Sequence, residues 1–184
     1  MLYDIIALLL DVAIGLIGGA CLLRWYMQQQ RVPFGNPLGR LVFALTNWLI
    51  LPLRRVLPPI GSWDTASLVA AYLLQLAQFG VLWMLRWGLT PAAVVPVLAA
   101  FGVARLMLSG LMGLVLVYAI LSWVQTASPL SDLMDRLCGP LLKPFRRRVP
   151  LVGGIDLSPL VLLVLLQVLA IVLSSLQNSV LHLI

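Results

Sequence analysis

Four long apolar runs dominate the chain, and each is long enough to cross a lipid bilayer as a helix. They cover residues 2–23, 65–87, 103–124 and 157–176. At about 1.5 Å per residue, runs of this length span the roughly 30 Å hydrocarbon core of a membrane. The first positive charge, Arg24, follows the first run, which is the reverse of a secretory signal peptide, so we expect a retained first span.

Two shorter stretches, 37–53 and 129–145, have leucines at helical spacing instead of a continuous apolar run. The pairs Asn36-Pro37 and Ser128-Pro129 precede them, and each pair is typical of a helix start. The apolar stripe of the first stretch consists of Leu41, Leu45, Leu49 and Leu53, and that of the second of Leu133, Leu137, Leu141 and Phe145. The pattern predicts two amphipathic helices that lie along the membrane surface.

The second half of the chain repeats the first half at a fixed offset. The string PFRRRVPLVGGIDLSPLV at 144–161 superposes without a gap on PLRRVLPPIGSWDTASLV at 52–69, 92 positions earlier. The Pro, Arg-Arg, Gly and Asp matches within it are specific, whereas leucine matches mean little in so apolar a chain. We therefore divide the chain into one copy at 1–87, an outer connector at 88–102 and a second copy at 103–184.

The connector and the symmetry follow from this division. Residues 88–102 contain two prolines and are moderately apolar, which fits either an outer loop or a short membrane-embedded segment. Because one copy holds two spans, both copies share an orientation, as in parallel-topology repeats.

Composition and charge agree with a membrane protein. The chain is 62% hydrophobic and 10% charged, with a mean hydropathy of +1.07, which excludes an ordinary soluble domain. Ten of the 12 Lys and Arg lie in the loops between spans one and two and between spans three and four. The positive-inside rule places both loops in the cytoplasm and both termini outside, and it explains the basic balance without a nucleic-acid partner.

The predicted fold is therefore all-α and integral to the membrane, with four transmembrane helices arranged as two parallel repeats. Each repeat has a cytoplasmic amphipathic surface helix between its two spans. We expect a multi-pass protein whose partners are the anionic headgroups of the bilayer, another membrane or cytoplasmic protein, or a second copy of itself.

The repeated string supplies the first group of candidate residues. Its charged and turn residues allow a charge-paired hinge that fixes each surface helix to the next span and holds an anionic headgroup or a partner. The structural alternative is that the arginines only mark cytosolic loops and that each Asp is only a helix N-cap. The candidates are Arg54, Arg55, Asp64, Arg146, Arg147, Arg148, Gly153, Asp156, Ser158 and Pro159.

Polar residues inside the apolar runs form the second group. Gln75 and Gln167 each lie about 16 Å past the Asp that precedes their span, near the bilayer midplane. They are either a pair of amides in a small polar site or interhelical hydrogen-bonding residues. Asp11 lies midway along the first run, where a carboxylate is a functional candidate or a protonated, hydrogen-bonded residue.

Catalytic and metal-binding signatures are missing. The chain has one His and no Glu, and it contains no phosphate-binding loop, dinucleotide fingerprint, metalloprotease motif or nucleophile elbow. Cys21 and Cys138 fall at unrelated repeat positions and fit no ligand spacing, so we expect free thiols. We expect no enzyme activity, no cofactor and no metal site.

The pattern P-x-R-R-x-x-P-x-x-G-x-x-D-x-S-P, within a duplicated four-span chain of this size, resembles the YggT family of bacterial inner-membrane proteins, which has relatives in cyanobacteria and chloroplasts. The first copy departs from the pattern, because Ala66-Ser67 replaces Ser158-Pro159. The resemblance implies links to osmotic tolerance and ion homeostasis, and in plastid relatives to nucleoid distribution or cytochrome assembly. It brings no catalytic residue.

Two functions from different classes fit these observations. The first is an interaction, assembly or membrane-organisation factor whose basic helices bind lipids or a partner complex. The alternative is a small transporter or channel subunit with Asp11, Gln75 and Gln167 near its path.

Overall fold

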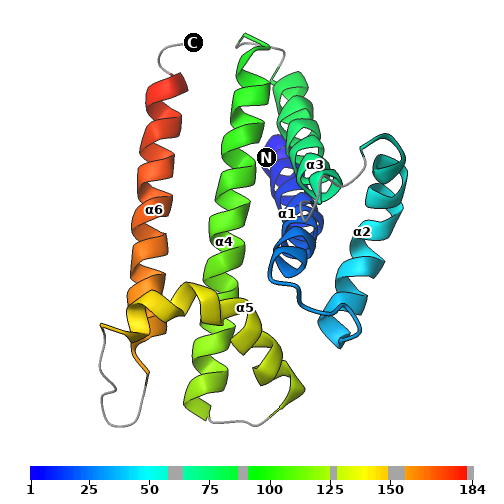
Figure 1. The fold of residues 1–184 in the computed structure, drawn as a ribbon. Coiled ribbons are helices and arrows are strands. Elements are labelled where there is room, and N and C mark those ends of the chain that lie inside the picture. Colours follow the sequence, from blue (N-terminus) through cyan, green and yellow to red (C-terminus); the bar gives the residue numbers. More distant parts are fainter. Residues whose placement is uncertain (58–63, 87–90, 125–127, 149–155, 182–184) are drawn as a thin grey trace. The chain divides into compact units, whose positions relative to one another are not determined.

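The structure is a computed structural model that describes residues 1–57, 64–86, 91–124, 128–148 and 156–181. Within these ranges the chain is all-helical and contains no strand (Figure 1). The helices are α1 (Leu2–Gln29), α2 (Pro37–Val56), α3 (Thr65–Leu85), α4 (Val94–Val124), α5 (Pro129–Arg146) and α6 (Ser158–Leu181). Helices α1, α3, α4 and α6 are long and apolar enough to cross a membrane, as predicted.

Three of the spanning helices are longer than the apolar runs that predict them, and the third of these, α6, continues to Leu181. Helix α1 continues to Gln29, because Arg24 and the residues after it include no helix breaker. Helix α4 begins at Val94, so residues 94–102 of the expected connector are helical. Pro96 lies in the first turn of α4, where its missing amide hydrogen breaks no helical bond.

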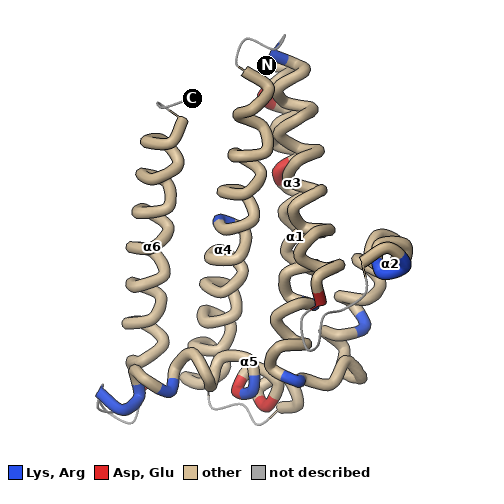
Figure 2. Tube along the Cα trace, turned by 45° about the horizontal axis from the view of Figure 1, so that its top comes forward, with Lys and Arg blue, Asp and Glu red and all other residues tan. Residues whose placement is uncertain are grey.

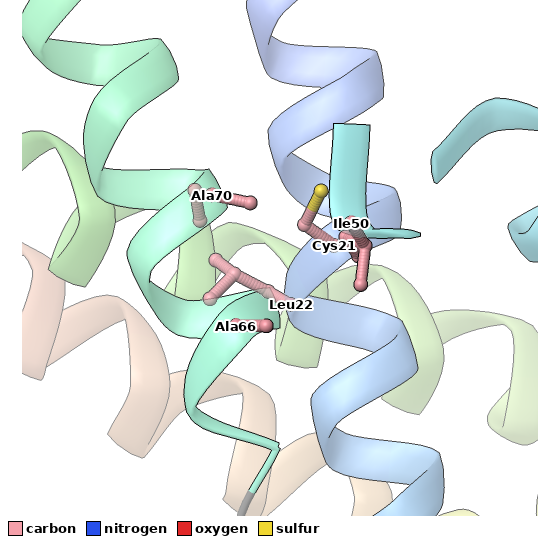
Figure 3. Packing of buried hydrophobic residues seen from close by; sticks show 6 residues of the cluster. Cys21, Leu22, Ile50, Ala66 and Ala70 are labelled. Carbon is pink, nitrogen blue, oxygen red and sulfur yellow. The ribbon is translucent and has the colours of Figure 1, made fainter. Parts of the chain in front are cut away.

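The residues form two compact units, Met1–Met107 with Leu173–Ile184, and Leu108–Val172. In the first unit, α1 packs mainly against α3, and α2 contacts both. Their shared core consists of Cys21, Leu22, Ile50, Ala66, Ala70 and Ala71 (Figure 3). The three alanines of α3 have small side chains, which let its backbone approach α1 and α2 closely.

Helix α2 begins at the predicted Asn-Pro pair and buries one face. The Asn36 side chain accepts a hydrogen bond from the Gly39 amide at 2.7 Å, and Pro37 is the first helical residue. The buried face consists of Gly39, Val42, Thr46 and Ile50. The predicted leucine stripe lies next to this face and is half-buried or exposed, and its Leu49 and Leu53 pack against the core.

In the second unit, α5 begins at the predicted Ser-Pro pair. The Ser128 hydroxyl accepts a hydrogen bond from the Ser131 amide at 3.2 Å. Of the predicted apolar stripe, Leu133 and Leu137 are buried and Leu141 and Phe145 are half-buried. Met134, Cys138 and Leu142 are also buried, while Asp132, Asp135, Arg136 and Lys143 are exposed. The apolar side chains of α5 are therefore turned towards its own unit and the charged ones away from it.

Candidate functional site: two arginine–aspartate clusters

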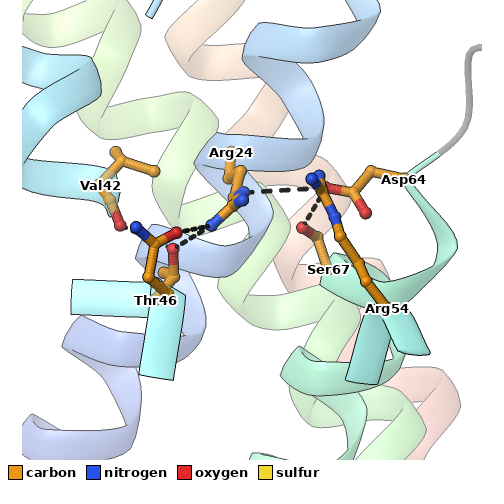
Figure 4. Close-up of polar contacts among 7 residues, drawn as sticks. Arg24, Val42, Thr46, Arg54, Asp64 and Ser67 are labelled. Carbon is orange, nitrogen blue, oxygen red and sulfur yellow. Dashed lines mark hydrogen bonds and ion pairs between the residues drawn. The ribbon is translucent and has the colours of Figure 1, made fainter. Parts of the chain in front are cut away.

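The first arginine–aspartate cluster joins α1, α2 and the start of α3 around one carboxylate (Figure 4). Asp64 occupies the N-cap position of α3, but its side chain makes no capping bond to the helix backbone. Its Oδ2 atom instead accepts hydrogen bonds from Arg54 Nη2 at 2.7 Å and from Ser67 Oγ at 2.6 Å. Arg24 Nε lies 3.8 Å from the same oxygen.

Arg24 connects this carboxylate to the middle of α2. Its side chain is 4% exposed, and Nη1 donates hydrogen bonds to Thr46 Oγ1 at 2.9 Å and to Asn47 Oδ1 at 2.8 Å. The guanidinium also lies 4.6 Å above the ring of Phe43, close enough for a cation–π contact. One buried arginine therefore connects α1, α2 and the start of α3.

The Asp64 side chain is fully buried, so its charge state depends on its partners. Burial by itself raises the pKa of an aspartate, but the hydrogen bonds from Arg54 and Ser67 and the charges of Arg54 and Arg24 outweigh burial and lower the pKa of Asp64. The carboxylate therefore stays ionised at neutral pH between two cations.

The second arginine–aspartate cluster lies in the second unit, 92 positions further along the chain. Arg146 Nε lies 2.8 Å from Asp156 Oδ2, and the Ser158 amide donates to Asp156 Oδ1 at 2.9 Å. Arg146 also donates a hydrogen bond to the Tyr118 hydroxyl of α4. The contact Arg54–Asp64 thus has an equivalent at Arg146–Asp156.

Hydrogen bonding also decides the charge state of the second cluster. Burial raises the pKa of Asp156, but the hydrogen bonds from the Ser158 amide and the Arg146 guanidinium lower it further than burial raises it. Burial lowers the pKa of Arg146, but the hydrogen bond to Asp156 and the nearby negative charge raise it by more, so the net shift is upward. Both residues are ionised at neutral pH.

The two clusters differ in burial and in composition. The side chains of Arg146 and Asp156 are 42% and 14% exposed, against 34% and 0% for Arg54 and Asp64. The position that matches Arg24 is Ser122, so the second cluster has one cation where the first has two. The first cluster is a buried three-charge group, and the second is a partly exposed pair.

Arginines next to each cluster are left for other contacts. Arg55, Arg147 and Arg148 are exposed, and none of the ion pairs among the described residues involves them. Figure 2 shows the basic residues on α2 and around α5, whereas α6 carries no charged residue.

Of the other predicted candidates, Ser158 and Pro159 are buried at the start of α6, and Gly153 lies outside the described residues.

The intramembrane candidates have different surroundings. Gln75 is buried against Gly102 of α4, whereas Gln167 is exposed on α6. Asp11 is exposed on α1 and accepts a hydrogen bond from Gln78 of α3. The expectation that the two glutamines meet stays a prediction.

Sequence reasoning did not identify Arg24, Thr46, Asn47, Ser67, Tyr118 and Gln78 as site residues. Arg24 had one usable signal, because it is a loop arginine of the first copy that has no counterpart in the second, where Ser122 stands at the matching position. Gln78 follows Gln75 by three residues, and this spacing places both amides on one side of α3. The role of Tyr118 had no signal in the pattern.

Thiol and metal chemistry have no support in the described part of the chain. Cys21 and Cys138 are free and buried. Burial raises the pKa of Cys138 to about 12, and the nearby Asp135 adds to this shift, so the thiol stays protonated. No three His, Cys, Asp or Glu residues of the described ranges are placed to hold a metal ion.

Comparisons with known proteins agree on one family. The family model described as CCB3/YggT matches residues 1–85 and 97–177. The uncharacterised protein YggT of Escherichia coli (strain K12) is 39% identical over 164 residues, which cover 87% of this chain and 84% of the relative. Uncharacterised proteins of Pseudomonas aeruginosa and Haemophilus influenzae are 35% and 31% identical, covering 76% and 87% of this chain and 73% and 86% of the relatives. No solved structure matches the chain significantly.

Proposed function

This chain belongs to the CCB3/YggT family, and we propose that it is a membrane-organisation or assembly factor whose cytoplasmic helices bind anionic lipid headgroups. One observation carries the proposal: an arginine–aspartate pair occurs twice, 92 positions apart, between a short amphipathic helix and the spanning helix that follows it. A topology signal alone needs positive charges but no aspartate partner at a fixed distance.

The two paired arginines form ion pairs within the protein, and the arginines next to them bind the anionic headgroups. Arg54 and Arg146 hold the end of each short helix at the start of the next span. This position leaves Arg55, Arg147 and Arg148 exposed, and each cation near an anionic leaflet gains on the order of 1 kcal/mol. We place the protein in the bacterial inner membrane, with both basic loops in the cytoplasm, both termini outside and no enzymatic step. The link to osmotic and ion homeostasis belongs to this proposal.

The test separates the exposed arginines from the paired ones. Replacing Arg55, Arg147 and Arg148 by Gln should remove co-purifying anionic phospholipid and abolish rescue of a strain that lacks its family member under osmotic upshift. The matched Lys variant, which keeps the charges, should retain both. Equal membrane levels of the two variants establish that insertion is intact. Full rescue by the Gln variant would end the proposal.

A small transporter or channel subunit is the second candidate, because polar side chains lie inside apolar helices. In the first unit, Arg105 of α4 donates a hydrogen bond to Gln177 of α6 at 2.9 Å, and Asp11 pairs with Gln78. This function predicts ion or osmolyte flux in liposomes that changes when Gln75 and Gln167 become Leu. Liposomes that stay sealed with pure protein would reject it.

A further inference from the structure

Asp11 is a carboxylate far from either end of an apolar helix. It lies nine residues after the first residue of α1, which corresponds to roughly 14 Å along the helix axis. The surrounding side chains are apolar, including Leu8, Leu9 and Val12, which are exposed as lipid-facing residues would be. An ionised carboxylate at such a depth is costly, so intramembrane Asp residues are paired, neutral or functional.

The partner of Asp11 is an amide, not a cation. Gln78 of α3 donates a hydrogen bond from Nε2 to Asp11 Oδ1 at 3.3 Å. None of the ion pairs among the described residues involves Asp11. An amide can donate to either a carboxylate or a carboxylic acid, so this bond by itself leaves the charge state open.

The carbonyl oxygen of the same Gln78 amide has no donor among the described residues. The Gln78 side chain is 5% exposed, and its Oε1 atom is buried without a hydrogen-bond partner in the described structure. A buried acceptor of this kind needs a donor. The amide already contacts Asp11 through Nε2, and a protonated carboxyl at Asp11 would supply that donor at its other oxygen.

Charged and titratable groups of the neighbouring helices are engaged elsewhere. Helix α3 contains no Asp, Lys or Arg, and its Tyr72 donates to the carbonyl of Pro96. Towards the helix start, Asp4 pairs with the N-terminal amine, and Arg86 stacks on Tyr3. Further engaged groups are Arg24, bonded to α2, and Arg105 of α4, bonded to Gln177. The remaining arginines of the first unit are Arg31, Arg40, Arg54 and Arg55, all in or before α2.

We propose that Asp11 and Gln78 form a proton-binding site between α1 and α3. The carboxylate takes up one proton from water to form an O–H bond at Oδ2, and the site changes from one negative charge to neutral. Oδ2–H then donates to Gln78 Oε1, while Nε2–H continues to donate to Oδ1. The acid and the amide form a ring of two hydrogen bonds, and every polar atom of the pair is satisfied.

The site occurs once in the chain, which separates it from the duplicated clusters. The repeat position of Gln78 is Ala170, and that of Asp11 is near Ser109. The inference does not rest on the proposed role of the basic helices, and the experiment below reads out a bound proton without any assay of function.

Infrared spectroscopy of the full chain in lipid bilayers tests the proposal, because a protonated carboxyl and a carboxylate absorb at separate frequencies. All six acidic side chains of the protein are Asp, so carboxyl-labelled ¹³C-aspartate assigns the band in the unsubstituted protein. We expect a protonated-aspartate band at neutral pH that is absent in Asp11→Asn. In Gln78→Leu the band should shift to higher frequency, because both hydrogen bonds to the amide are lost, including the one that Oδ1 accepts from Nε2.

The same infrared spectrum provides a control and shows which results would overturn the proposal. Asp4→Asn, on the same helix but at its exposed end, should leave the band unchanged. If the labelled wild-type protein shows no protonated-aspartate band at neutral pH, or if Asp11→Asn retains it, the proposal is wrong. A carboxylate band at Asp11 that responds to Na⁺ or K⁺ but not to pH would indicate a metal-ion site and would also overturn it.

Discussion

At the scale of single residues, the two aspartates of the clusters have the same sequence context but different dependence on their partners. Asp64 is buried between Arg54 and Arg24, whereas Asp156 pairs with an arginine that solvent partly reaches. Removing one partner of a buried ion pair leaves an uncompensated charge, while an exposed pair contributes little. The same substitution should therefore have unequal effects at the two positions.

Asp64→Ala should lower the free energy of unfolding by about 3 to 5 kcal/mol, because Arg24 is left buried without an anion. Asp156→Ala should cost about 1 kcal/mol or less, since water can solvate Arg146. Thermal unfolding in detergent, followed by circular dichroism, measures both. Equal costs at the two positions would contradict the difference in burial.

Acid should weaken the first cluster in a definite direction. The folded protein holds the pKa of Asp64 below its ordinary value of 3.8, so the stabilisation is fully present above that value. It is lost as the pH falls from there through the lowered folded pKa, where the carboxylate takes up a proton. Melting temperature against pH should fall in this acid window, and the fall should be smaller in Asp64→Asn. A profile that the substitution leaves unchanged would count against the assignment.

At the scale of helices, the contact between α3 and the first half of α4 depends on a glycine. A Cβ atom added at Gly102 would collide with the Gln75 amide oxygen and lie 2.9 Å from a ring carbon of Phe79. Small residues let membrane helices approach closely, and here the small residue makes room for an amide. The buried state of Gln75 follows from this close approach.

Gly102→Ala should destabilise the first unit by about 1 to 3 kcal/mol through overpacking. Gly110→Ala is the matched control on the same helix, because a Cβ there meets nothing within 4 Å. Adding Gln75→Ala to Gly102→Ala should recover part of the loss by removing the colliding amide. Thermal unfolding of the three variants checks the order, and a Gly110→Ala variant as unstable as Gly102→Ala would refute the contact.

At the scale of the whole molecule, most of the helical content was predictable because long apolar runs have one physical solution in a membrane. Spanning segments must satisfy their backbone hydrogen bonds internally, so the four runs had to be helices. The partners of Asp64 and Asp156 followed from a repeated spacing of ten residues between Arg and Asp. Helix lengths were less predictable, since α1, α4 and α6 all extend beyond their predicted apolar runs.

The remaining part of the site depended on tertiary packing. Arg24 reaches α2 only because α1 continues past its apolar run, and the leucine stripe of α2 did not indicate that Val42, Thr46 and Ile50 form the buried face. Gln78 and Asp11 are 67 residues apart, and nothing in the sequence pairs them. The internal repeat, the surface position of α2 and α5, and the orientation stay predictions.

Cysteine labelling of the two clusters tests the central claim most directly, which is that both present their arginines on the cytoplasmic side. Single variants Arg55→Cys and Arg148→Cys replace exposed residues, while the native Cys21 and Cys138 are buried and should react little. A membrane-impermeant maleimide should label both variants in inverted vesicles and neither in intact cells, and Asp4→Cys should show the reverse. Labelling of the two arginine positions from opposite sides of the membrane would contradict the account.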